Sequence, residues 1–287
     1  MQLGIVFPQL EIGDDPVVIR DFAQAAEAMG FHHILIYDHV LGADRDRPGG
    51  FRGPYDKDST FHEPFVTLGY LAGLTKTIEL ATGVIILPQR QTALVAKQAA
   101  QVDVLSGGRL RLGVGTGWND VEYEALGEDF HNRGKRQEEQ VDLMRALWRD
   151  DAISFDGKWH KVTKAGIKPR PKRDIPIWFG GSAPALVQRI AKQGDGWIPI
   201  MGPNDAAREM IAAIHTAMTA HGRDPQSLGI QAQAQVAGGN PERWAKNASA
   251  WQALGATHLG LGTMGAGLPN VEAHLKAAEQ WKAAITA

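Results

Sequence analysis

Short apolar runs of β type alternate with segments of helical periodicity along the whole chain of 287 residues. The first repeat begins with the apolar run at residues 3–7 and continues in a helix that starts at Asp15-Pro16, with proline in its first turn. Apolar residues then recur at the spacing of one helical face, and Gly30 ends the helix. This alternation of strands and helices predicts an α/β protein built from repeated βα units.

The repeat continues to the end of the chain. The predicted strands lie at residues 3–7, 32–37, 78–87, 109–115, 175–181, 196–200, 228–237 and 257–262. Eight units match a (β/α)8 TIM barrel better than an open doubly wound sheet, in which about six strands are typical. Because no linker-like segment divides the chain, we expect one domain over residues 1–287.

Two segments do not fit this repeat and predict insertions in the loops of the barrel. Residues 42–59 form a loop rich in glycine, proline and charge, which is either a lid over the active site or a disordered insertion. Residues 153–162, ISFDGKWHKV, have the pattern of a β-hairpin that turns at Asp156-Gly157.

The composition excludes several classes of protein. A hydrophobic content of 44%, a charged content of 22% and a net charge of -2 are typical of a globular chain without a global attraction for nucleic acid or anionic membranes. The absence of cysteine excludes disulfides and thiolate catalysis, and the 10 histidines show no zinc-binding pattern. The chain has neither a signal-peptide pattern nor an apolar run of ~20 residues. We therefore expect a cytoplasmic protein without membrane anchor or metal, whose partner is a small molecule.

Residues that directly follow a strand are the candidates for chemistry, because the active site of a TIM barrel lies at the C-terminal ends of its strands. Asp38 and His39 end an apolar strand, where a charged pair has little structural reason to stand. A carboxylate beside an imidazole can orient the ring for proton transfer. The pair is therefore a candidate catalytic dyad, and a solvated pair in a loop is the alternative.

Three glycine-containing segments also follow strands. The turn GVGTGW at residues 113–118 lacks the third glycine of the dinucleotide-binding fingerprint, since Trp118 stands in its place. Gly83 interrupts a β-branched run, which predicts either a packing bulge or a close approach to a ligand. The segment Gly180-Gly181-Ser182 precedes a helix, where free N–H groups can bind an anion, unless its serine simply caps the helix.

Taken together, these segments resemble the luciferase-like superfamily of flavin and deazaflavin oxidoreductases, in particular the subgroup that depends on coenzyme F420, an 8-hydroxy-5-deazaflavin. The resemblance runs from Asp38-His39 through residues 81–127 to IPIWFGGSAPAL and GDGWIPI, and its most specific part is LSGGRLRLGVGTGW. Such proteins are (β/α)8 barrels, often dimeric, that hold the cofactor ring at the C-terminal mouth. The resemblance therefore implies an F420-binding barrel that forms a homodimer, with FMN as the alternative cofactor.

The resemblance also implies roles for individual residues. It places the cofactor ring against Thr116, Gly117 and Trp118, with the alternating glycines of the turn leaving room for it. It implies a non-proline cis peptide at Gly83-Val84 that backs the ring. The phosphate would be held by Gly180, Gly181 and Ser182, and a longer acidic tail would reach basic groups such as Arg52, Lys57 or Arg90.

The chain departs from the alcohol and sugar-phosphate dehydrogenases of this superfamily at two places. Trp118 stands where those enzymes have a glutamate acid, and residues 41–43 occupy the region of their tryptophan. Trp118 either walls the cofactor and substrate pocket or is a core residue at the start of the next helix.

These departures mean that the substrates of those dehydrogenases cannot be transferred to this chain. Our leading hypothesis is an oxidoreductase that moves a hydride between C5 of the deazaflavin and an organic substrate. In this hypothesis His39 lies near the reacting carbon and is oriented by Asp38. The alternatives are an FMN-dependent monooxygenase that uses oxygen, and a cofactor-binding carrier without turnover.

Overall fold

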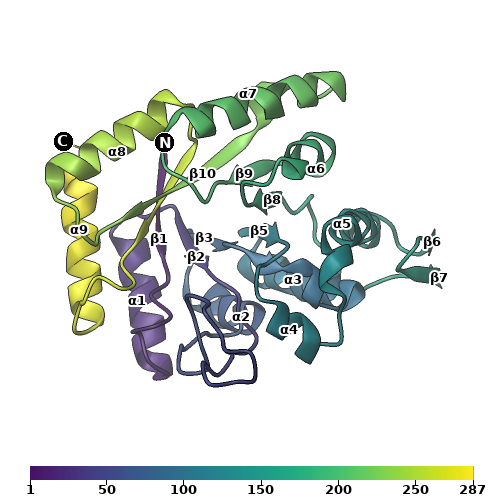
Figure 1. Cartoon of the computed structure of the whole chain (residues 1–287), viewed down its shortest axis with the longest axis horizontal. Helices are drawn as coiled ribbons and strands as arrows, with labels where there is room; N and C mark the ends of the chain where they lie inside the picture. Colours follow the sequence, from purple (N-terminus) through teal and green to yellow (C-terminus); the bar gives the residue numbers. More distant parts are fainter. Residues whose placement is uncertain (287) are drawn as a thin grey trace.

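A closed barrel of parallel strands surrounded by helices forms the centre of the computed structural model, which describes residues 1–286 (Figure 1). Strand pairing runs from β3 through β2, β1, β11, β10, β9 and β8 to β5, and a further pairing of β3 with β5 closes the ring. The predicted (β/α)8 TIM barrel is therefore confirmed. The barrel strands are β1 (Gln2–Val6), β2 (His33–Ile36), β3 (Glu79–Thr82), β5 (Leu110–Gly115), β8 (Ile177–Gly180), β9 (Gly196–Ile198), β10 (Gly229–Gln235) and β11 (His258–Gly262).

The third barrel strand is interrupted at the point where glycine stands in its β-branched sequence. β3 ends at Thr82, and the short strand β4 (Ile85–Ile86) continues the path and pairs with β5. Between them lies the predicted cis peptide bond, Gly83-Val84. The single predicted strand at residues 78–87 is thus two pieces joined by a bulge, which changes the direction of the side chains that follow.

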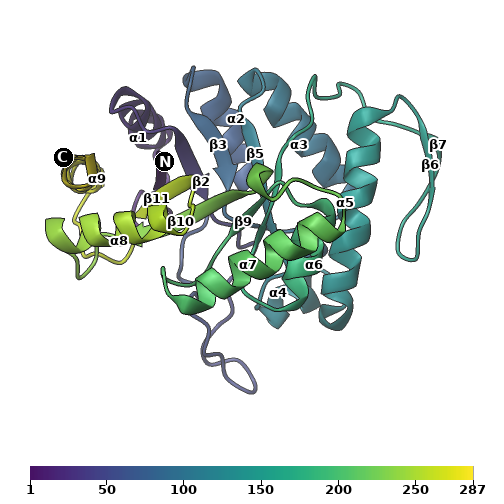
Figure 2. The same cartoon turned by 90° about the horizontal axis from the view of Figure 1, so that it is seen from above.

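Helices cover the outside of the barrel, as the view from above shows (Figure 2). The first one begins as its sequence predicts, because Pro16 occupies the first turn and the Asp15 side chain accepts a hydrogen bond from the Val17 N–H at 2.8 Å. The helices are α1 (Pro16–Ala28), α2 (Pro64–Leu74), α3 (Thr92–Ser106), α4 (Asp120–Ala125), α5 (Arg133–Arg149), α6 (Ala185–Gln193), α7 (Asp205–Ala220), α8 (Pro241–Ala253) and α9 (Val271–Thr286).

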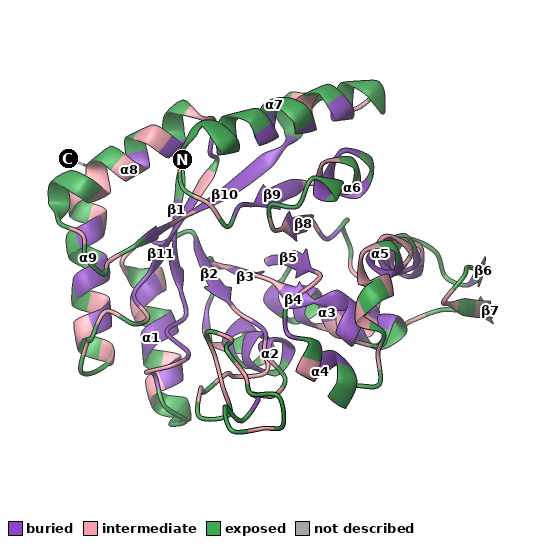
Figure 3. Ribbon diagram, in the orientation of Figure 1, coloured by how far each residue is buried: buried purple, intermediate pink, exposed green. Residues whose placement is uncertain are grey.

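Burial follows this arrangement, with the barrel strands buried and the outer faces of the helices exposed (Figure 3). Short 3-10 helices lie at η1 (Leu87–Gln89), η2 (Phe130–Asn132) and η3 (Pro225–Ser227). Within residues 1–286, no helix is both long enough and apolar enough to cross a membrane. Nor do three or more His, Asp or Glu side chains of this part of the chain gather as metal ligands do.

Both predicted insertions lie outside the ring of barrel strands. The predicted hairpin is confirmed as the antiparallel pair β6 (Ile153–Asp156) and β7 (Lys161–Ala165), and it projects from the barrel beside α5 (Figure 1). Its turn is fastened by the Glu139 carboxylate, which accepts hydrogen bonds from the backbone N–H groups of residues 158, 159 and 160. The other insertion, residues 42–59, contains turns but no helix or strand.

A polar cluster fills the barrel toward the N-terminal ends of its strands. The buried Arg111 guanidinium donates to Glu79 at 2.7 Å and to Gln231 at 2.9 Å, and it lies 4.3 Å from the centre of the Trp178 ring. The His258 ring packs on the same tryptophan. Burial and the charge of Arg111 lower the pKa of His258 to about 3. For the buried His33, the same two causes hold the pKa well below its usual value.

Candidate active site

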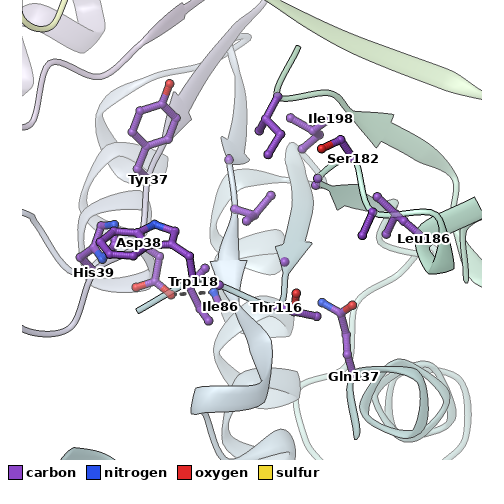
Figure 4. Close-up of a pocket in the computed structure, with 18 of the residues that line it drawn as sticks. Tyr37, Asp38, His39, Ile86, Thr116, Trp118, Gln137, Ser182, Leu186 and Ile198 are labelled. Carbon is purple, nitrogen blue, oxygen red and sulfur yellow. Dashed lines mark hydrogen bonds between the residues drawn. The ribbon is translucent and has the colours of Figure 1, made fainter. Parts of the chain in front are cut away.

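A cavity of about 490 Å³ opens at the C-terminal ends of the barrel strands (Figure 4). Its walls come mainly from residues at or just after the ends of β2, β3, β5, β8 and β9. The residues predicted for catalysis, for the cofactor ring and for the phosphate all line this one cavity, although they come from segments far apart in the chain. These residues are Asp38, His39, Gly83, Val84, Thr116, Gly117, Trp118, Gly180, Gly181 and Ser182.

Glycines at the C-terminal ends of β5 and β8 make room for neighbouring side chains. A Cβ atom on Gly115 would lie 2.4 Å from Cγ2 of Val84, and one on Gly180 would lie 2.7 Å from Cγ1 of the same valine. A Cβ on Gly117 would lie 2.7 Å from Ile86, and its φ of 66° also favours glycine. Gly115 and Gly117 therefore leave room for Val84 and Ile86. Val84 lies between the ends of β5 and β8 and forms an apolar floor of the pocket.

Asp38 does not orient His39, so this part of the sequence prediction is wrong. Its carboxylate accepts hydrogen bonds from Arg90 at 2.7 and 3.1 Å. It also accepts one from the Ile86 N–H at 2.9 Å (Figure 4). Neighbouring residues of an extended segment point their side chains to opposite sides, so adjacency in sequence does not bring the two side chains together. Asp38 instead ties the end of β2 to β4.

His39 contacts a different carboxylate, that of Glu122 in α4. Nδ1 of His39 lies 3.2 Å from Oε1 and 3.3 Å from Oε2 of Glu122, whose side chain is 0% exposed. Glu122 is not among the site residues predicted from the sequence. Its position does indicate a place near the site, because it lies in the first turn of the helix that follows β5, where active-site residues of this fold gather.

Aromatic side chains surround His39 on its other sides. The ring centres of Tyr55, Phe61 and Trp118 lie 5.2, 4.7 and 5.7 Å from that of His39. Tyr55 belongs to the loop 42–59, which thus contributes to the pocket wall. Trp118 is 43% exposed, so the alternative of a core residue is wrong and the indole forms part of the wall.

The opposite end of the pocket lies at β8 and α6. The Gly181 N–H donates to the Ile198 carbonyl at 3.1 Å, so it is already used within the barrel. Ser182 lines the pocket and does not cap α6, whose N-cap is Pro184. Arg189 of α6 lines this end, although its Nε also donates to Glu138 at 2.8 Å.

The basic groups expected for an acidic tail are placed elsewhere. Arg90 pairs with Asp38 and Glu63, and Lys57 pairs with the exposed Asp58. Neither residue lines the pocket, and neither does Arg52. Arg189 is the arginine of the pocket wall, and the sequence did not indicate it, because its position depends on how α6 packs against α5.

Two amide side chains add polar groups to the pocket. Gln137 of α5 is only 1% exposed, and its Nε2 has no hydrogen-bond partner among residues 1–286. A buried donor without a partner is costly and indicates a missing acceptor. On the other side, the Tyr37 hydroxyl donates to Oε1 of Gln233 at 3.0 Å.

These features fit a flat ring with an anionic extension. Val84 and Ile86 would give such a ring an apolar support, and the glycine turn would let the backbone approach it closely. The unpartnered donor of Gln137 and the charge of Arg189 suit phosphate oxygens at the other end. A TIM barrel with such a pocket is typical of the class of barrels that bind a cofactor.

The chain belongs to the luciferase-like monooxygenase family, whose sequence profile matches residues 4–286. This confirms the superfamily predicted from the sequence. The chain is 31% identical over 255 residues to the F420-dependent hydroxymycolic acid dehydrogenase of Mycobacterium tuberculosis, a match that covers 87% of this chain and 66% of that protein. It is also 32% identical over 184 residues to the pyrimidine monooxygenase RutA of Allorhizobium ampelinum, covering 61% of this chain and 50% of the relative.

Solved structures show the same fold. An F420-dependent secondary alcohol dehydrogenase in complex with an F420-acetone adduct superposes with a TM-score of 0.82 and covers 99% of this chain and 98% of its own. The two sequences are 19% identical, so this likeness concerns the fold.

Proposed function

We propose that the protein is an oxidoreductase that transfers a hydride between coenzyme F420 and an organic small molecule. The observation that carries the proposal is the placement of His39, held by a buried carboxylate, in the same pocket as the apolar floor at Val84. The 31% identity to an F420-dependent dehydrogenase over 87% of the chain supports the choice of cofactor.

The residues of the pocket divide into two groups in this proposal. Gly83, Val84, Thr116 and Gly117 hold the deazaflavin ring, and Trp118 closes one side of the space next to it. The anionic end is held by Ser182, Gln137 and Arg189, beside Gly180 and Gly181, and the N–H of Gly181 itself donates to the Ile198 carbonyl. When bound, the coenzyme supplies the site that gives or accepts the hydride.

Proton exchange belongs to His39 in this proposal. The indole of Trp118 stands where dehydrogenases of the superfamily have an acid, and indole is a donor that does not titrate in the physiological range. His39 has a ring nitrogen, Nε2, without a hydrogen-bond partner among residues 1–286. Reduction of an activated C=C or C=N bond therefore suits the site better than oxidation of a sugar.

An FMN-dependent monooxygenase is the second candidate, favoured by the 32% identity to pyrimidine monooxygenase RutA. The two candidates differ in their need for oxygen. A carrier without turnover has less support, because a carrier does not need an imidazole held by a buried carboxylate.

We also infer a homodimer in the cytoplasm. α2 and α3, which pack against each other, carry large exposed apolar side chains at Val66 (70%), Leu94 (53%) and Leu105 (57%). Exposed apolar side chains on two neighbouring helices are what a dimer interface would cover. Light scattering should show a dimer that the double variant Leu94→Glu/Leu105→Glu converts to a monomer, and a monomeric unaltered protein would contradict the inference. The absence of cysteine is compatible with a reducing cytosol.

The function is tested by following reduced F420 under nitrogen and under air, with a panel of enones, imines and ketones. We expect oxidation of the coenzyme that depends on the organic compound and not on oxygen. Oxygen-dependent turnover with reduced FMN would instead support the monooxygenase. As a test of binding, Arg189→Gln should raise the Kd for F420 about tenfold or more, since a charge-assisted hydrogen bond contributes ~1.5–3 kcal/mol.

A further inference from the structure

The carboxylate of Glu122 is the only hydrogen-bond partner of His39 side-chain nitrogens among residues 1–286. Both of its oxygens lie near Nδ1, at 3.2 and 3.3 Å, and Nε2 makes no hydrogen bond in this part of the chain. An ionised carboxylate can only accept hydrogen bonds. The contact therefore requires the proton of a neutral His39 ring to reside on Nδ1.

Glu122 is itself held in place from several sides. Its Oε1 accepts from the Val40 N–H at 2.9 Å and from the Leu41 N–H at 3.4 Å, and its Oε2 accepts from Nε2 of Gln89 at 3.3 Å. Burial would raise the pKa of this carboxyl group, but the hydrogen bond and the charge interaction with His39, together with the hydrogen bonds from Gln89 and Val40, outweigh burial and lower it. Glu122 thus stays ionised beside the imidazole.

We propose that Glu122 is the positioning residue of His39. It fixes the ring in the Nδ1–H tautomer and thereby leaves the lone pair of Nε2 as the proton acceptor for the pocket. The proposal rests on the proposed function, because it gives the role of His39 in proton exchange a physical basis. Glu122 acts through His39 and has no place in the wall of the pocket.

The same carboxylate joins three segments of the active site. It reaches from α4 after β5 to the start of the loop after β2, through the N–H groups of Val40 and Leu41, and to η1 through Gln89. Asp38 does not share the task, since its carboxylate binds Arg90 and the Ile86 N–H and makes no hydrogen bond to His39. A single acidic group therefore sets both the tautomer of the imidazole and the path of the chain next to it.

The test compares two substitutions of similar size. In Glu122→Gln an acceptor oxygen remains for Nδ1–H, and the buried Oε1 of Gln89, which lacks a partner among residues 1–286, can accept from the new amide if the Gln89 side chain flips. In Glu122→Met no acceptor remains. Glu124→Gln is the matched control, because Glu124 lies in the same helix with its side chain 76% exposed.

The readout is the tautomer of His39 in the protein without cofactor, measured by long-range ¹H–¹⁵N correlation spectra. The spectrum of His39→Ala identifies the signals. We expect Nδ1–H in the unaltered protein, in Glu122→Gln and in Glu124→Gln, and a shift toward Nε2–H in Glu122→Met. An Nε2–H ring in the unaltered protein, or an unchanged tautomer in Glu122→Met, would overturn the proposal. Because the first outcome needs no variant, the proposal is testable even if the methionine variant fails to fold.

Activity provides a second readout once a substrate is known. Glu122→Met should lower kcat by about tenfold or more, a part of the 10²–10⁴ that an acid–base group supplies, while KM stays within about threefold. Glu122→Gln should recover much of this loss. The tautomer measurement does not involve F420, so a chain that shows the expected tautomers but no F420 turnover refutes the proposed function and leaves the positioning role intact.

Discussion

Asp38 and Arg90 form a two-point ion pair in which Nη2 and Nε of the guanidinium lie 2.7 and 3.1 Å from the two carboxylate oxygens. The side chains are 1% and 13% exposed, so the pair lies in the interior. Oδ2 of Asp38 also accepts from the Ile86 N–H, which begins the path of the chain out of the bulge. Asp38 thus stabilises the segment that forms the pocket floor.

We therefore expect Asp38→Ala to act on stability. Removing one partner of a buried pair leaves an uncompensated charge and costs about 3 kcal/mol. The free energy of unfolding, measured in urea, should fall by this amount. The matched control is Asp58→Ala, at an exposed ion pair with Lys57, which should change little. An Asp38→Ala protein as stable as the unaltered chain would contradict the structural role.

The contact between Gly115 and Val84 predicts a coupling that a double-mutant cycle can measure. Gly115→Ala places a Cβ 2.4 Å from Cγ2 of Val84 and should destabilise the protein by about 1–3 kcal/mol. In the Val84→Ala background the added methyl group has room, so the same change should cost less. Additive effects, with a coupling energy near zero, would show that the two residues do not share this space.

His39 and Trp118 should differ in the kinetic parameter that they control. His39→Ala removes the group that exchanges the proton and should lower kcat by ~10² or more while F420 still binds. Trp118→Phe keeps an aromatic wall of smaller size and should alter mainly KM. Steady-state kinetics on both variants decide between these roles. A fully active His39→Ala together with an inactive Trp118→Phe would reverse the assignment.

The buried histidines of the barrel predict how stability depends on pH. The unfolded chain binds a proton at each histidine near pH 6.5, whereas His258 in the folded protein does so only near 3 and His33 well below its usual value. Their contribution to the free energy of unfolding is therefore fully present above pH 6.5. It is lost as the pH falls below this value, by up to ~1.4 kcal/mol per pH unit for each group.

Urea unfolding between pH 7 and 5 measures the effect of the histidines with lowered pKa values, to which His274 also belongs through its burial, because the carboxyl groups with lowered pKa values titrate below this window. His258→Gln should flatten the decline, and the exposed His131→Gln should leave it unchanged. If His258→Gln had the same slope as the unaltered protein, His258 would not be a source of the pH dependence.

The fold and the location of the site follow from local patterns in the sequence. The alternation of strands and helices predicts the barrel, and the barrel places everything that follows a strand at one end. For this reason the sequence predicts that segments as distant as Asp38-His39 and Gly180-Gly181 face one pocket, and all four residues line it. The glycine at position 83 predicted the break between β3 and β4 because it interrupts a β-branched run.

The partners of the site residues do not follow from local patterns. His39 and Glu122 are 83 positions apart, and Asp38 and Arg90 are 52 apart, so their pairing depends on the closure of the barrel. Side-chain direction matters as much, because it separates the neighbours Asp38 and His39. The need for glycine at positions 115 and 180 likewise depends on a distant residue, since Val84 lies between them.

The identity of the cofactor is tested most directly by titrating the protein, free of cofactor, with F420 and with FMN in parallel, and following the fluorescence of the cofactor. We predict saturable binding of F420 to the pocket, with a Kd at least about tenfold below that of FMN, a difference of ~1.4 kcal/mol. Saturable, tight binding of FMN without saturable binding of F420 would contradict an F420-dependent oxidoreductase.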